Sequence, residues 1–230
     1  MNATPDHIFY ETAGNREYGL RFDVATGARK ILIIPPLFDE MNRTRRMIVE
    51  AMRALAVQGV SSVLPDLPGC NESLAQMSQQ SLTGWRNAVR DITRQIHVTH
   101  IAALRGGCLL DDEAGPPSLR LAPVAGATLL KTMLRTRIAA DREAGISASM
   151  DVLRTQGARD NLDLAGYVVS PVMLNELDTA SPVQGDHIHE LPMSDIAGTP
   201  LWLRSEPGEN AQMSSALALQ WDSWSATCVR

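Results

Sequence analysis

The chain has 230 residues, of which 44% are hydrophobic, enough to bury the core of one large domain. Its formal net charge of −5 gives no reason to expect nucleic acid or an anionic membrane surface as a partner. Cys70, Cys108 and Cys228 stand far apart without a CxxC pair, which suits a reducing compartment. The amino terminus lacks a signal-peptide pattern, and no window approaches the ~20 apolar residues of a membrane span, so we expect a cytoplasmic protein.

Two stretches near the amino terminus, 7–12 and 18–24, alternate apolar and polar residues and are separated by turn residues at 13–15. This pattern predicts an antiparallel hairpin at the edge of a sheet. Three short apolar runs, each stopped by proline or glycine, are typical of buried strands. They occupy 30–35, 60–65 and 98–104.

Segments with helical spacing of their apolar residues separate these runs, and we expect helices at 42–58 and 81–95. Strands that alternate with helices predict a parallel sheet covered on both faces. In such sheets, binding and catalytic residues lie on the loops at the carboxyl ends of the strands.

The second half of the chain is less regular. A strongly amphipathic helix is expected at 127–143. The other expected elements are a strand at 118–124, a helix at 145–154, a strand at 163–170, a helix at 171–177, a loop at 179–192, a last strand at 200–204 and a closing helix at 213–226. We interpret the chain as a single domain, residues 1–230, with an inserted helical lid at roughly 125–195.

Several motifs carry a resemblance. They are Pro35–Met47 (PPLFDEMNRTRRM), Leu64–Cys70 (LPDLPGC), Leu104–Gly107 (LRGG), and the later segments 121–126 and 165–171. Together they resemble the α/β-hydrolase superfamily, and most closely the exosortase A system-associated hydrolases of the second type. The resemblance implies a three-layer α/β fold with a mostly parallel sheet, and a genomic link to extracellular polysaccharide and protein-sorting loci. It supplies no substrate.

A working serine hydrolase of this fold needs a Gly-x-Ser-x-Gly elbow between strand and helix. The corresponding residues are 103–107, and Arg105 occupies the nucleophile position. A guanidinium stays protonated and cannot attack a carbonyl, although it can bind a carboxylate or phosphate with two hydrogen bonds. The triad histidine should follow the last strand. The last histidine, His189, precedes the strand expected at 200–204, so two of the three triad members are absent.

Polar and charged residues follow the first buried strand, where the resemblance places the oxyanion loop. The candidate ligand-binding residues are Phe38, Asp39, Glu40, Asn42, Arg45, Arg105 and Gly106. Because an unpaired guanidinium in a crevice is costly, we expect Arg105 to pair with Glu40 or Asp39. Two interpretations remain open: a purely architectural ion pair, or a polar pocket that recognises a small anionic ligand.

Other functions remain open at this point. One is an active esterase, thioesterase or acyltransferase with a relocated cysteine nucleophile, Cys70 or Cys108. Another is a scaffold or partner-binding protein, with the apolar 127–143 helix as a homodimer interface. His187 and His189 alternate with acids, but without a recognisable third ligand we interpret them as a solvated loop and expect neither a metal nor a cofactor. We interpret the acidic run at 111–113 as a charged helix face or a solvated turn.

Overall fold

The computed structural model describes residues 4–25, 28–204 and 206–227, and Cys228 lies outside them. The strands are β1 (Asp6–Thr12), β2 (Asn15–Phe22), β3 (Lys30–Ile34), β4 (Ser61–Pro65), β5 (His100–Leu104), β6 (Ser118–Leu121), β7 (Leu162–Leu164), β8 (Tyr167–Val169) and β9 (Ile188–Leu191). The α-helices are α1 (Asp39–Val57), α2 (Leu82–Gln95), α3 (Gly126–Glu143), α4 (Met150–Gly157), α5 (Pro171–Thr179) and α6 (Ala211–Thr227). Four short 3₁₀ helices are η1 (Met77–Gln79), η2 (Arg105–Leu109), η3 (Met193–Asp195) and η4 (Leu201–Leu203).

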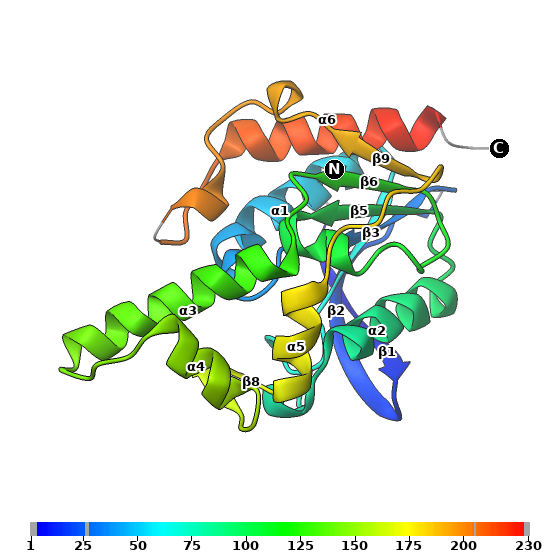
Figure 1. Cartoon of the computed structure of the whole chain (residues 1–230). Coiled ribbons are helices and arrows are strands. Elements are labelled where there is room, and N and C mark those ends of the chain that lie inside the picture. Colours follow the sequence, from blue (N-terminus) through cyan, green and yellow to red (C-terminus); the bar gives the residue numbers. More distant parts are fainter. Residues whose placement is uncertain (1–3, 26–27, 205, 228–230) are drawn as a thin grey trace.

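Seven strands form one twisted sheet in the order β1-β2-β4-β3-β5-β6-β9 (Figure 1). The amino-terminal hairpin is antiparallel, as its alternating pattern predicts, and β2 also pairs antiparallel with β4. Every pair from β4 to β9 is parallel. Ala13 and Gly14 close the hairpin with φ angles of 49° and 77°, the left-handed conformation that a two-residue turn requires.

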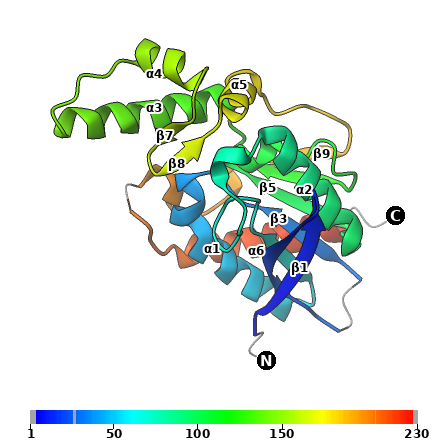
Figure 2. The ribbon, with the colours of Figure 1, turned by 90° about the horizontal axis from the view of Figure 1, so that it is seen from below.

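Helices cover both faces of the sheet, so the fold has three layers (Figure 2). The helices α1 and α6 pack on one face around a buried cluster that includes Ile31, Met52 and Trp221. On the other face, α2, α3 and α5 share a second cluster with the inward side chains of the strands, among them Trp85 and Leu130. These layers place the carboxyl ends of β3, β4, β5 and β6 at one edge of the molecule.

The helix α1 begins at Asp39, three residues earlier than its apolar spacing predicts. Immediately before the helix, Phe38 adopts a non-helical backbone conformation, with φ 56° and ψ −135°. Asp39 and Glu40 therefore lie in the first turn, where negative charge is favourable against the helix dipole. This early start brings both carboxylates to the edge of the sheet where β5 ends.

The last strand of the sheet is not where the sequence predicts it. The segment 200–204 contains η4 (Leu201–Leu203) and no strand, and the strand lies instead at β9, inside the segment expected to be a loop. The residues of β9 pair in parallel with β6, from Ser118↔Ile188 to Leu121↔Leu191. A strand this short, at the edge of a sheet, owes its conformation to its partner, so its own pattern is too weak to predict it.

Other boundaries also differ. The helix expected at 145–154 begins only at Met150, because Gly145 adopts φ 76° after α3 and Ser149 caps the new helix. The strand expected at 163–170 is a small hairpin, β7 and β8, separate from the main sheet. It turns at Ala165 and Gly166, with φ angles of 55° and 87°.

Between β6 and β9 the chain forms α3, α4, the β7–β8 hairpin and α5. The helices α3 and α4 extend away from the sheet, as Figures 1 and 2 both show. The apolar face of α3 is nevertheless buried within this chain: Leu130 and Leu134 are fully buried, and Leu129 and Met133 nearly so. These four side chains are therefore already covered by the chain itself, and the homodimer stays a prediction.

Within the acidic run at 111–113, Glu113 is exposed in a turn, but Asp111 differs from the charged helix face or solvated turn that we expected. The Asp111 side chain is fully buried and receives hydrogen bonds from Ser118 and from Nε and Nη2 of Arg120. Arg120 is equally buried, and its Nη1 donates to the Val183 carbonyl at 2.5 Å. The Asp111–Arg120 pair therefore links the segment after η2, the strand β6 and the chain before β9.

No helix in the described part of the chain is long and apolar enough to cross a membrane.

Candidate functional site

The turn after β5 is built by Arg105, Gly106 and Gly107. Arg105 has a φ of 54°, an uncommon conformation for a residue with a side chain. A Cβ on Gly106 would lie 2.6 Å from Leu129 Cδ1, and a Cβ on Gly107 would lie 2.5 Å from the Pro35 carbonyl oxygen. The two glycines therefore let the turn pack tightly against the loop after β3, and this turn holds Arg105 at the strand end.

Arg105 binds Glu40 with two hydrogen bonds. Its Nε donates to Oε2 and its Nη2 to Oε1, both at 3.1 Å, and its Nη1 donates to the Ala122 carbonyl at 3.2 Å. The side chains of Arg105 and Glu40 are 18% and 17% exposed. The Trp202 ring centroid lies 5.4 Å from the guanidinium carbon. Of the two partners expected for Arg105, the structure shows Glu40 and not Asp39 bonded to it.

The neighbouring candidates have partners of their own. Asp39 forms an ion pair with Arg43, one turn further along α1. Asn42 donates to the Tyr167 hydroxyl at 3.1 Å, linking α1 to the β7–β8 hairpin.

Arg45 and Phe38 are the remaining candidate ligand-binding residues. Arg45 donates at 2.9 Å to Asp66, whose carboxylate is fully buried at the end of β4. Phe38 is buried, with its ring centroid 5.5 Å from that of Trp85 and 5.4 Å from that of Tyr167. Asn42 and Arg45 thus brace α1 against the hairpin and the β4 loop, whereas Glu40 and Arg105 face each other directly.

A cavity of about 80 Å³ lies beside the Arg105–Glu40 pair. Its walls come from the β3 loop, the start of α1, α3, the β7–β8 turn and η4. They are Leu37, Phe38, Asp39, Glu40, Arg43, Leu129, Thr132, Met133, Thr136, Ala165 and Trp202. The volume accommodates about two or three water molecules, well below the ~300 Å³ of an ordinary small-molecule pocket. The side chains of α3, the β7–β8 turn and η4 therefore leave little open space beside the Arg105–Glu40 pair.

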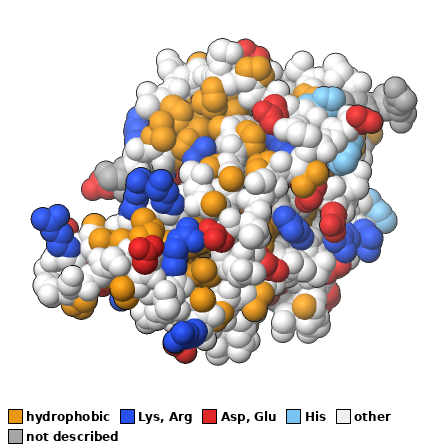
Figure 3. Space-filling model, in the orientation of Figure 1, with side chains coloured by type: hydrophobic (Ala, Val, Ile, Leu, Met, Phe, Trp, Pro, Cys, Tyr) orange, Lys and Arg blue, Asp and Glu red, His pale blue; other side chains and the backbone are white. Residues whose placement is uncertain are grey.

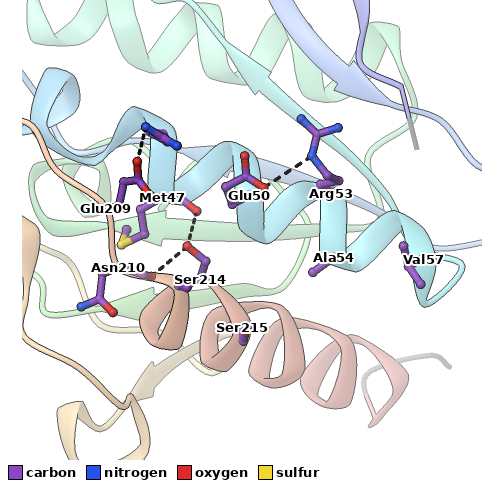
Figure 4. Close-up of a pocket in the computed structure, with 11 residues that line it drawn as sticks. Met47, Glu50, Arg53, Ala54, Val57, Glu209, Asn210, Ser214 and Ser215 are labelled. Carbon is purple, nitrogen blue, oxygen red and sulfur yellow. Dashed lines mark hydrogen bonds and ion pairs between the residues drawn. The ribbon is translucent and has the colours of Figure 1, made fainter. Parts of the chain in front are cut away.

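A larger pocket of about 520 Å³ lies between α1 and α6, away from the β5 turn (Figure 4). Arg46 forms an ion pair with Glu209 at its edge, and Glu50 pairs with Arg53. Ser214 donates to the Met47 carbonyl at 3.0 Å. This pocket is larger than the cavity beside Arg105, but its charged side chains form ion pairs with one another. We therefore assign it no role in chemistry.

The described cysteines are poor nucleophiles where the structure places them. Burial raises the pKa of the Cys70 thiol to about 12, with Asp66 and Glu17 adding to the effect. Burial also raises the pKa of Cys108 well above its ordinary value, and the thiol donates to the Ala103 carbonyl. A thiolate is the reactive form, so both environments oppose attack by sulfur.

The histidines lie away from the β5 turn. His189 is an exposed residue of β9, and His187 is exposed just before it. Among residues 4–25, 28–204 and 206–227, no group of three His, Cys, Asp or Glu side chains is arranged to hold a metal ion. His100 begins β5 at the opposite end of the strand and is 3% exposed. Burial, and then the nearby Arg29, lower its pKa.

Sequence reasoning missed Trp202, which lines the cavity beside Arg105, and Tyr167, which packs on Phe38 and accepts a hydrogen bond from Asn42. Trp202 falls in the segment predicted as the last strand, and Tyr167 in the one predicted as an unbroken strand. Both are aromatic residues in short segments rich in turn formers, but nothing in their local pattern relates them to Arg105. The two residues reach these positions only because the β7–β8 hairpin and η4 fold over the carboxyl ends of the strands.

The solved structures that are similar to this one include α/β hydrolases. Est1E from Butyrivibrio proteoclasticus bound to ferulic acid aligns with a TM-score of 0.53 and 16% identity, over 75% of this chain and 70% of that one. Est1E in a second structure aligns with a TM-score of 0.50, again at 16% identity, over 75% and 69% of the two chains. An α/β serine hydrolase without a lid from Xanthomonas campestris gives a TM-score of 0.45 at 18% identity, over 55% and 64%.

The sheet order, the layers and these similarities define the chain as a protein of the α/β-hydrolase fold. No family model and no curated protein matches its sequence.

Proposed function

We propose that this chain is a hydrolase-fold protein that binds a small anionic ligand instead of cleaving an ester by serine chemistry. The observation that carries the proposal is Arg105, held on the turn after β5 and bound by two hydrogen bonds to Glu40. In this proposal the protein acts within an exosortase-associated export or polysaccharide system, as the PPLFDEMN and LPDLPGC motifs suggest.

Two residue types support the proposed absence of serine chemistry. A guanidinium has no nucleophilic lone pair at neutral pH, so Arg105 cannot start acyl transfer. The general base of a triad should follow the last strand, and the sequence has no histidine after β9. His189 lies on β9, the last strand of the sheet, and therefore does not follow it as a triad histidine would.

The cysteine alternative is less well supported. Cys70 would need a neighbouring base and a depressed pKa, whereas its burial raises the pKa to about 12. Cys108 is buried beneath the turn with a raised pKa. A thiol in either environment is almost entirely protonated at neutral pH.

The ligand would be a carboxylate or a phosphate that takes the place of Glu40 on Arg105. A guanidinium offers a planar set of donors that binds such groups through two parallel hydrogen bonds. Leu37, Leu129 and Met133 would contact an apolar body attached to the anion. Glu40 is partly exposed at the cavity, and in this proposal its side chain rotates toward solvent when the ligand binds.

Glu40→Gln is the most direct test, because it weakens the internal competitor and keeps its size. We expect it to tighten binding of small aliphatic and aromatic carboxylates, measured by calorimetry, whereas Arg105→Gln abolishes binding. A panel of p-nitrophenyl esters and thioesters should show no turnover in either variant or in the parent chain.

Two outcomes would defeat the proposal. Turnover that disappears after treatment with a thiol-blocking reagent would establish a cysteine enzyme. A loss of thermal stability in both variants, with no carboxylate or phosphate bound by any of the proteins, would leave the pair as architecture alone.

A further inference from the structure

Charge is distributed unevenly along the chain. Residues 126–160, which form α3, α4 and their connections, contain six Lys and Arg and four Asp and Glu, a net charge of +2. The whole chain carries −5, so the remaining residues carry −7. Residues 126–160, which include the part of the molecule that extends furthest from the sheet, are therefore net basic although the whole chain is acidic.

Three cations lie on one side of α3. Lys131, Arg135 and Arg142 are separated by four and seven residues, which places them within about 40° of one another around the helix and along about 16 Å of its length. All three are exposed. The acid Asp141 is on another side, buried and paired with Arg137, and Glu143 lies about 100° from Arg142. We call Lys131, Arg135 and Arg142 the α3 basic strip.

The strip differs from most other cations of the chain. Twelve arginines form ion pairs with a carboxylate, among them Arg105 and Arg120. Within the described ranges, the three residues of the strip form none. Positive charge on the strip is thus left for an external partner.

An exposed aliphatic residue lies at the end of the strip. Ile146, in the connection after α3, is 55% exposed, although it is a large apolar side chain. Together with Ile138 and Arg142 it lines a shallow hollow of about 380 Å³. Figure 3 shows blue and orange side chains, with some red ones among them, along the projecting part of the molecule, on the left. Cationic and aliphatic groups therefore share one surface.

We propose that the α3 arm, residues 126–148, docks on an anionic phospholipid surface. The basic strip would bind lipid headgroups, and Ile146 would insert at the boundary between headgroups and acyl chains. Charge complementarity selects an anionic partner. The aliphatic tip favours lipid over nucleic acid, because single-stranded nucleic acid is bound by aromatic stacking and residues 126–160 contain no Phe, Trp or Tyr. This inference is independent of the crevice around Arg105.

The test compares two triple variants in the whole chain. K131Q/R135Q/R142Q neutralises the strip, and R16Q/R94Q/R204Q removes the same charge from exposed positions elsewhere. Cosedimentation is measured with vesicles of pure phosphatidylcholine and of phosphatidylcholine mixed with phosphatidylglycerol. We expect the parent chain and the control variant to bind only the anionic vesicles, and the strip variant to bind on the order of a hundredfold more weakly.

Two further measurements complete the design. Ile146→Ser should weaken vesicle binding about tenfold while the circular dichroism spectrum is unchanged. Raising the salt concentration should release the parent chain from anionic vesicles. The proposal is overturned if the anionic vesicles are not bound, if neutral vesicles are bound equally, or if both triple variants lose binding to the same extent. Binding of RNA or of an acidic polypeptide through the strip, without vesicle binding, would overturn it in favour of another anionic macromolecule.

Discussion

Two arginine–carboxylate pairs flank the short helix η2, and their surroundings differ. The Arg120–Asp111 pair is fully buried, and Arg120 also bonds the Val183 carbonyl. The Arg105–Glu40 pair is partly exposed and borders a cavity. A fully buried pair has no room to exchange its partner, whereas our proposal requires the partly exposed pair to exchange Glu40 for an external anion. Burial, and not the residue types, separates the structural pair from the candidate binding site.

Breaking the buried pair should have the largest effect. Asp111→Asn removes the charge that compensates Arg120 and leaves a buried guanidinium unpaired. We expect the free energy of unfolding to fall by about 3–5 kcal/mol, measured by urea denaturation. A change below about 1 kcal/mol would mean that water reaches Arg120, and the contrast between the two pairs would fail.

Breaking the exposed pair should cost less. Arg105→Ala removes two hydrogen bonds to a charged group that solvent already reaches, and the free energy of unfolding should fall by about 1–3 kcal/mol. Glu40→Gln, which keeps the size and one hydrogen bond, should cost less than Arg105→Ala. If either variant were as destabilised as Asp111→Asn, the Arg105 pair would be structural in the same sense as the buried one.

The opposite end of β5 provides a pH-dependent comparison. His100 is buried, its Nδ1 lies 2.8 Å from Thr99 Oγ1, and its pKa is lowered from 6.5 in the folded chain, chiefly by burial and then by Arg29. The unfolded chain therefore takes up a proton at a higher pH than the folded chain does, so stability should decline as the pH falls below about 6.5. Unfolding measured across this range for the parent and for His100→Gln should show a shallower decline in the variant. Parallel curves would exclude His100 as the origin.

The smallest expected effect concerns catalysis. Arg105→Ser creates the sequence Ala103-Leu-Ser-Gly-Gly107, which lacks only the first glycine of the Gly-x-Ser-x-Gly elbow, but it supplies no general base, because no histidine follows β9. We expect ester hydrolysis to remain at the background rate, measured with p-nitrophenyl acetate. The appearance of turnover would mean that another residue activates the serine and that the crevice retains more catalytic machinery than Arg105 suggests.

The sequence by itself determined the alternation of strands and helices, the amino-terminal hairpin, and the presence of an arginine where a hydrolase places its nucleophile. These features are local, since they depend on periodicity, turn residues and a motif of five residues. Ser81, for example, caps α2 where the helix was predicted to begin, accepting a hydrogen bond from the Gly84 amide.

Only the tertiary structure decided the features that depend on partners distant in the chain. The strand β9 exists because β6 pairs with it, and Glu40 instead of Asp39 reaches Arg105 because α1 begins after the distorted Phe38. Asp111 is buried because Arg120 comes to it from β6. Burial and pairing across the sheet set these outcomes, and no local pattern of residue types encodes which long-range partner will be present.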